Sequence, residues 1–167
     1  MTDRILNVLF LCTGNSARSI LAESLLNAAG KGRFMAFSAG SHPAGTVNPY
    51  VLEFLAQRGL PTEGLRSKNW EEFALPDAPK LDFVITVCDN AAGEVCPIWP
   101  GRPATVHWGF PDPSRVEGGD DAKRAAFDQV FVAIRRRIEL LVNLPVDKLE
   151  HLALKDELKR IHAGGAA

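Results

Sequence analysis

The chain has 167 residues, of which 46% are hydrophobic, and its formal net charge at pH 7 is −1. This size and composition predict one compact α/β domain, and the near-zero charge gives no sign of a protein that binds nucleic acid or a membrane surface. No apolar stretch is long enough to span a bilayer and the N-terminus lacks the form of a secretory signal, so we expect a cytoplasmic protein.

Strand and helix patterns alternate along the chain. Short apolar runs predict strands over 5–11, 34–39, 83–87 and 105–108. Apolar positions at helical spacing and capping residues predict helices over 19–29, 48–59 and 120–144, with a short helix near 70–73. This alternation predicts a parallel sheet flanked by helices, with ligands bound beyond the carboxyl ends of the strands.

The first loop carries the most informative motif. Residues 12–19 read CTGNSARS and lie between a buried strand and a helix. Backbone N–H groups at a helix N-terminus favour an anion, and a guanidinium adds a two-pronged contact to the same oxygens. We therefore expect the loop to bind a tetrahedral oxyanion through Thr13, Gly14, Asn15, Ser16, Ala17 and Arg18.

Cys12 lies at the floor of this predicted anion site. The positive field there should lower the pKa of its thiol below the ordinary value of about 8.5, and Ser19 could donate a hydrogen bond to the thiolate. The alternative is a buried structural cysteine at the end of a core strand. We favour a nucleophile, because Arg18 follows at a suitable spacing.

The other two cysteines follow the third predicted strand. Cys88 comes directly after the strand, and seven small or polar residues separate it from Cys96, which predicts a mobile surface loop. Two cysteines that frame such a loop can form and release a disulfide, and their spacing is unlike that of a zinc site. The alternative is that Cys88 is a core residue at the end of the strand and that Cys96 has no functional role.

Asp112 lies in the segment that follows the fourth predicted strand. Proline flanks it on both sides in the sequence WGFPDP, which stiffens the loop. Its carboxyl group is therefore a candidate general acid over an anion bound at the first loop. The alternative is an aspartate that faces solvent in a turn.

Two segments near the C-terminus carry less information. The run Arg135–Arg137 lies on the long predicted helix and is interpreted as a solvated face, with a partner-docking patch as the lesser alternative. We treat residues 1–146 as the catalytic domain and 147–167 as a helical extension with a disordered end. This last helix is expected to pack on the core, or else to form a dimer or partner surface.

The motifs together resemble a known enzyme family, the arsenate reductases built on the low-molecular-weight protein tyrosine phosphatase fold. The resemblance covers residues 5–144 and rests on Cys12–Ser19, Ser38–Gly40, Thr86–Cys88, Cys96–Pro97 and Trp108–Pro113. It implies a four-stranded parallel sheet in a flavodoxin-like three-layer sandwich. Cys88 and Cys96 favour the reductases over the phosphatases. Ser114 and Arg115 stand where phosphatases usually carry aromatic residues for a substrate tyrosine.

The resemblance also implies a mechanism that detoxifies arsenic. Cys12 attacks arsenate while Asp112 protonates the leaving hydroxyl group, and Arg18 with the loop amides holds the remaining oxygens. Cys88 then attacks Cys12, arsenite leaves, and Cys96 takes over the disulfide. Thioredoxin or a similar dithiol protein is the implied reductant, and phosphate or sulfate would mimic the substrate.

Some relatives of this kind bind potassium near the first loop. Asn15, Glu23 and Ser38 match part of that site, so the resemblance implies a possible potassium ion and no tightly bound cofactor. Glu23 is equally interpreted as an ordinary carboxylate in the first turns of a helix.

Two other functions stay open at this stage. One is a low-molecular-weight phosphatase that hydrolyses phosphate monoesters through a cysteinyl-phosphate, which would need Cys12, Arg18 and Asp112 alone. The other is a non-catalytic regulator that binds an oxyanion or senses redox state. Such a regulator would bind oxyanions without turnover.

Overall fold

The computed structural model describes residues 5–87 and 103–145. These residues form a single four-stranded sheet of β1 (Leu6–Leu11), β2 (Phe34–Ala39), β3 (Phe83–Thr86) and β4 (Ala104–His107). All of the pairings are parallel, in the order β2-β1-β3-β4. The parallel sheet predicted from the alternating pattern is confirmed.

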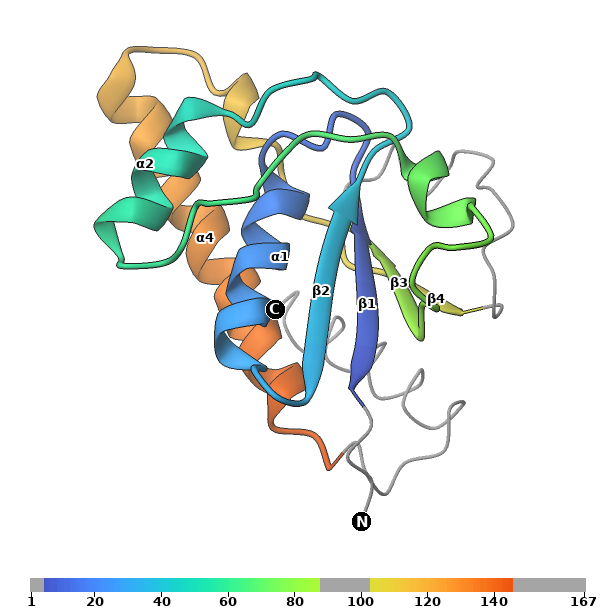
Figure 1. The fold of residues 1–167 in the computed structure, drawn as a ribbon. Coiled ribbons are helices and arrows are strands. Elements are labelled where there is room, and N and C mark those ends of the chain that lie inside the picture. Colours follow the sequence, from blue (N-terminus) through green and yellow to red (C-terminus); the bar gives the residue numbers. More distant parts are fainter. Residues whose placement is uncertain (1–4, 88–102, 146–167) are drawn as a thin grey trace.

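Three α-helices and two short 3₁₀ helices accompany the sheet in the described residues (Figure 1). They are α1 (Arg18–Ala29), α2 (Pro49–Gln57), α4 (Asp120–Val142), η1 (Trp70–Ala74) and η2 (Pro113–Arg115). The predicted elements differ from these at their ends by no more than two residues, and η2 was not predicted. None of the helices within the described ranges is long and apolar enough to cross a membrane.

The strand β1 lies in the middle of the sheet, and this position explains why its side chains are buried. Residues 8–11 of β1 are almost fully buried, because β1 has a neighbour on each side and packing on both faces. Alternate side chains point to opposite faces, so Val8 and Phe10 join one apolar cluster and Leu9 and Leu11 another. A continuous apolar run is the expected sequence of such a strand.

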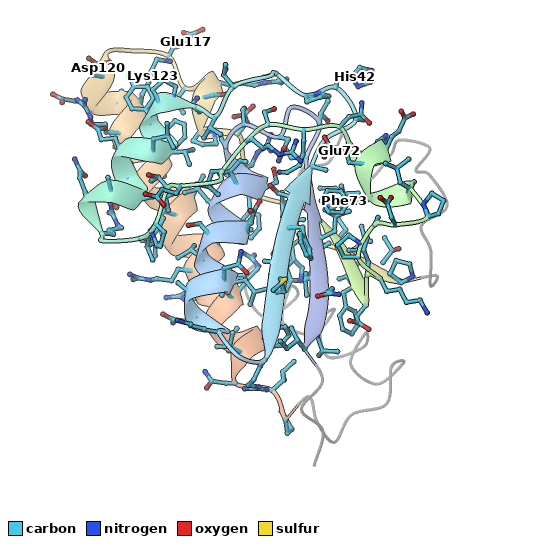
Figure 2. All side chains as sticks on the ribbon, viewed as in Figure 1. His42, Glu72, Phe73, Glu117, Asp120 and Lys123 are labelled. Carbon is cyan, nitrogen blue, oxygen red and sulfur yellow. The ribbon has the colours of Figure 1, made fainter. Side chains whose placement is uncertain are left out.

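The two faces of the sheet are covered differently. Figure 1 shows α1, α2 and α4 together on one side, where Ile20, Phe127 and Ile134 belong to the same apolar cluster as Phe10. The other face is covered, within the described residues, by η1. The ring of Phe73 in η1, which is labelled in Figure 2, has its centre 5.5 Å from that of the Phe37 ring of β2.

The long helix α4 ends two residues earlier than its apolar pattern predicts. Asn143 donates a side-chain hydrogen bond to the Glu139 carbonyl, and Pro145 prevents the chain from continuing as a helix. The Arg33 guanidinium donates to the Val142 and Leu144 carbonyls at 2.5 and 2.6 Å. The carbonyl of Val142, the last residue of α4, is therefore satisfied by a side chain from outside the helix.

The strand order fixes where a ligand can bind. The chain leaves β1 for β2 on one side and later returns to β3 on the other, so β1 and β3 form a topological switch point. At the carboxyl edge, Leu11, Thr86 and His107 are aligned in register. The segments that begin at residues 12, 87 and 108 therefore start side by side.

Candidate active site

The carbonyl groups of the loop between β1 and α1 are fixed by hydrogen bonds from a neighbouring segment of backbone. The segment after β2 runs across the carboxyl edge of the sheet (Figure 1), and its amides donate three hydrogen bonds to loop carbonyls. The pairs are His42 N to Thr13 O, Ala44 N to Gly14 O and Asn48 N to Ser16 O, each at 2.9 Å. His42 is labelled in Figure 2.

This anchoring aims the loop amides inward. In a trans peptide the N–H points opposite to the C=O of the same unit. Because three carbonyls bond outward, the N–H groups of Gly14, Asn15 and Ala17 face the inside of the loop, beside the first turn of α1. The result is a concave set of donors suited to an oxyanion.

Asn15 fixes the turn of this loop. It is the only non-glycine residue with positive φ among the described residues, at 45°, and it is fully buried. Its Nδ2 donates to Ser19 Oγ at 2.9 Å, and its Oδ1 accepts from the Lys68 amide at 2.8 Å. Since Asn15 donates to Ser19 Oγ, the hydroxyl proton of Ser19 is left for another acceptor.

Gly40 allows the loop to lie close to β2. A Cβ atom on Gly40 would come within 2.4 Å of the Thr13 carbonyl oxygen and 2.6 Å of the Cys12 carbonyl oxygen. Any larger residue would therefore displace the loop backbone. The sequence shows only that a glycine closes the second strand, and its role depends on this tertiary approach.

Arg18 points its guanidinium toward the segment after β4. Nη1 donates to the Phe110 carbonyl at 2.9 Å, and Nη2 lies 3.5 Å from Asp112 Oδ2. Its Nε is buried and has no hydrogen-bond partner within the described residues. A buried cationic donor without a partner is costly and indicates a place for an acceptor.

Asp112 caps η2 and faces Arg18. Its Oδ1 accepts hydrogen bonds from the Ser114 amide and hydroxyl, and Oδ2 lies 3.5 Å from both Arg18 and Arg115. Burial by itself would raise the pKa of Asp112, but the Ser114 hydrogen bonds and the two guanidinium groups hold it below its ordinary value. Asp112 is therefore ionised before any anion binds.

These groups surround one cavity of about 230 Å³. It is lined by Cys12, Thr13, Gly14, Ser16, Ala17, Arg18, Asp112, Ser114 and Arg115. The structure thus brings Cys12, Arg18 and Asp112 together as candidate residues. The volume is below the range of about 300–1,000 Å³ for drug-sized ligands, which suits a small anion.

The comparison with known families decides where the chain belongs. A family model described as low molecular weight phosphotyrosine protein phosphatase matches residues 7–157. The chain belongs to this family. The family resemblance predicted from the motifs is confirmed.

Within the family, the chain is a homologue of arsenate reductases. It is 37% identical to the arsenate reductase of Halalkalibacterium halodurans over 132 residues, which are 79% of this chain and 91% of the relative. The crystal structure of arsenate reductase from Archaeoglobus fulgidus matches with a TM-score of 0.64 and 31% identity, covering 82% of this chain and 99% of that one. A thioredoxin-dependent arsenate reductase of Corynebacterium glutamicum matches with a TM-score of 0.57 and 27% identity, over 84% and 65% of the two chains.

Cys88 and Cys96 lie outside the described residues of this family member. The last described residue before them is Val87, whose amide donates to the Leu11 carbonyl at 2.8 Å. Val87 precedes Cys88 and Leu11 precedes Cys12. The predicted roles of the two cysteines stay predictions.

Of the residues predicted for potassium, Glu23 faces the Lys68 ammonium, Ser38 bonds to Glu23, and Asn15 contacts the Lys68 backbone. Ser38 Oγ donates to Glu23 Oε1 at 2.5 Å, and Lys68 Nζ lies 3.9 Å from the same oxygen. Burial raises the pKa of Glu23 against the opposing effects of Ser38 and Lys68, and burial lowers the pKa of Lys68 against the effect of Glu23. No group of three or more His, Cys, Asp or Glu side chains within residues 5–87 and 103–145 is arranged to hold a metal ion.

Arg137 corrects the interpretation of the basic run on the long helix. Its side chain is buried, with a relative exposure of 5%, and its guanidinium carbon lies 4.5 Å from the centre of the Phe110 ring. Of the three arginines in this run, only Arg135 and Arg136 are exposed. Consecutive residues point in different directions around a helix, so one arginine of the three faces the core. Phe110 in turn holds Arg18 through its carbonyl.

Proposed function

We propose that the chain is an arsenate reductase that converts arsenate to arsenite with electrons from cysteine thiols. The observation that carries the proposal is the cavity in which Cys12 lies with inward-facing amides, Arg18 and Asp112. Homology to arsenate reductases supports the choice of substrate. The thiols supply the electrons, so the reaction as proposed uses no resident cofactor.

Arsenate binding exchanges one anion for another. In the resting pocket, the Asp112 carboxylate is the partner of Arg18. An incoming arsenate takes as donors the loop amides and Arg18 Nε, which has no partner among the described residues, and phosphate or sulfate binds in the same way. The bound negative charge raises the pKa of Asp112, so Asp112 becomes able to carry a proton.

The first chemical step joins sulfur to arsenic. The Cys12 thiolate attacks arsenic(V), one As–O bond breaks, and Asp112 gives its proton to the leaving hydroxide, which departs as water. Arg18 and the amides hold the remaining oxygens as charge redistributes. The product of this step is a Cys12–arsenic(V) adduct.

The second step moves two electrons to arsenic. The Cys88 thiolate attacks the Cys12 sulfur, the S–As electron pair stays with arsenic, and arsenite leaves with a Cys12–Cys88 disulfide behind it. Cys96 then attacks Cys88, which releases the Cys12 thiolate and leaves a Cys88–Cys96 disulfide. This second step is supported by the hydrogen bond from Val87 to Leu11, the residues that precede Cys88 and Cys12 in the sequence.

A dithiol protein completes the proposed cycle. Thioredoxin or a similar protein reduces the Cys88–Cys96 disulfide by two further exchanges, each of which oxidises its own dithiol. A thioredoxin-dependent relative supports this choice of donor. We place the reaction in a reducing cytoplasm, where such donors are maintained.

The test is arsenate-dependent NADPH oxidation in the presence of thioredoxin and thioredoxin reductase. The native chain should turn over only when arsenate is present, and Cys12→Ser, Cys88→Ser and Cys96→Ser should each abolish multiple turnovers. Lys31→Ala, a substitution at an exposed residue, is the control for activity lost during purification and assay. Unchanged arsenate turnover in Cys88→Ser would refute the relay.

Phosphate-ester hydrolysis is the second candidate, because the matching family model is that of phosphatases and their chemistry needs only Cys12, Arg18 and Asp112. Hydrolysis of p-nitrophenyl phosphate that depends on Cys12 but not on Cys88 or Cys96, without any arsenate reduction, would favour it. Oxyanion binding without either reaction would favour a regulator.

A further inference from the structure

A buried lysine lies directly behind the oxyanion loop. The Lys68 side chain is only 9% exposed, and its Nζ donates to the Arg66 carbonyl at 2.9 Å. The same ammonium lies 3.9 Å from Glu23 Oε1, whose own side chain is 14% exposed. A lysine is almost never buried unless it is paired with an opposite charge, and Glu23 supplies that charge here.

The pair is connected to both sides of the loop. The Lys68 amide donates to Asn15 Oδ1, and Asn15 holds Ser19 in the first turn of α1. Glu23 lies one turn further along α1 and accepts from Ser38 of β2. Asn15, the residue with the left-handed backbone, is thus fixed from the segment that carries the ammonium.

The oxygen donors of this cluster do not suit an added potassium ion. Asn15 Oδ1 accepts from the Lys68 amide, and Glu23 Oε1 accepts from Ser38 and faces the ammonium. A potassium ion bound to Glu23 would lie within a few ångströms of another positive charge and would share its carboxylate. Like charges at that distance repel strongly in a buried setting.

We propose that the Lys68 ammonium serves as a built-in monovalent cation at this position, so that the oxyanion loop of this chain is assembled without potassium. Lys68 is thus a positioning residue: it is not among the residues that line the cavity, its ammonium faces Glu23, and its backbone amide holds Asn15. The inference rests on the oxyanion-binding part of the proposed function and not on arsenate chemistry.

The charge balance explains why the two residues depend on each other. Removing one partner of a buried ion pair leaves the other charge uncompensated, which is strongly destabilising. Lys68→Ala therefore leaves Glu23 buried without a cation and opens space beside it. A potassium ion from solution can then occupy the space, which would make a cation dependence appear where the native chain has none.

The experiment measures the dissociation constant of phosphate by isothermal titration, together with the melting temperature. Each is determined in KCl, NaCl and choline chloride at equal ionic strength. The native chain should give the same values in all three salts. Lys68→Ala should bind phosphate about tenfold more weakly in choline chloride, within the usual range of coupling between sites, and should recover saturably with KCl.

Matched variants separate the charge from the fold. Lys31→Ala removes an exposed lysine and should behave as the native chain. Lys68→Arg keeps a cation and should stay independent of potassium even if Lys68→Ala does not fold. The double variant Lys68→Ala/Glu23→Gln removes both charges and should lose the response to potassium.

Three results would overturn the inference. They are a saturable, potassium-specific gain in the native chain, a folded Lys68→Ala with native phosphate affinity in choline chloride, and a Lys68→Arg variant that needs potassium. None of these measurements involves arsenate turnover. Failure of the reductase proposal would therefore leave this inference standing, and the reverse also holds.

Discussion

At the scale of single residues, the Asp112 carboxylate supplies the negative charge that faces Arg18 when no anion is bound. Asp112 Oδ2 lies 3.5 Å from Arg18 Nη2, where an oxyanion would otherwise supply the negative charge. Arg18 also keeps one buried N–H without a partner among the described residues. The pocket is therefore preorganised for an anion and needs little rearrangement beyond the release of Asp112.

Arg18→Lys should separate charge from geometry. A lysine keeps the positive charge but loses the forked donors, one of which fixes the Phe110 carbonyl. We expect kcat/KM for arsenate to fall by about 10²-fold, the usual effect of losing one transition-state donor. Arg115→Lys, at a residue with 79% side-chain exposure, should change it only slightly. Near-native activity of Arg18→Lys would contradict this role.

Asp112→Asn should change the acid stability of the fold. The folded-state pKa of Asp112 is below its ordinary value of 3.8, so the ionised carboxylate stabilises the fold above that pH. This contribution is lost as the pH falls through the folded-state pKa. The difference in melting temperature between the native chain and Asp112→Asn should therefore be largest near neutrality and vanish in strong acid. A difference that persists unchanged at the acid end would contradict the assignment.

At the scale of elements, the site depends on how β2 and α4 approach the loop. Neither Gly40 nor Arg137 contributes to the chemistry, and both act through the backbone that they support. Gly40 permits a close approach to the Cys12 and Thr13 carbonyls. Arg137 packs on the ring of Phe110, whose carbonyl holds Arg18.

Gly40→Ala should displace the oxyanion loop. Its Cβ would be 2.4 Å from a backbone oxygen, and the backbone has to move to accommodate it. We expect unfolding free energy to fall by about 1–3 kcal/mol and phosphate affinity to drop with it. Gly119→Ala, where an added Cβ meets nothing within 4 Å, is the control and should keep phosphate affinity. Equal phosphate binding by both variants would show that the loop tolerates the change.

Arg137→Ala should destabilise the fold by about 2 kcal/mol, the scale of a desolvated cation–π contact. Phe110 would lose its packing partner, so phosphate binding should weaken as well. Urea unfolding and isothermal titration measure the two effects. Arg136→Ala, which changes an exposed neighbour on the same helix, should be close to native. If both variants unfold alike, Arg137 has no special role.

At the scale of the whole molecule, sequence patterns predicted the elements and the edge where the site lies. The apolar run of β1 and the helical spacing of α4 depend on burial, which the sequence records directly. Cys12, Arg18 and Asp112 were predicted to meet at one edge, and they line one cavity. Gly40, Lys68 and Arg137 were not predicted as part of the site, because their roles depend on which distant backbone lies beside them.

Two predictions concern parts of the chain outside the described residues. The division into a catalytic domain over 1–146 and an extension over 147–167 stays a prediction, as does the helix expected in that extension. The relay through Cys88 and Cys96 is the other, and it is central to the proposed function.

The most direct measurement of that relay is a single turnover without any external reductant. Reduced protein is mixed with an excess of arsenate, arsenite is quantified, and the disulfide is located by mass spectrometry of alkylated peptides. We expect one arsenite per chain and a Cys88–Cys96 disulfide, with a trapped Cys12–Cys88 disulfide in Cys96→Ser. No arsenite, or arsenite formed while Cys88 and Cys96 stay reduced, would contradict it.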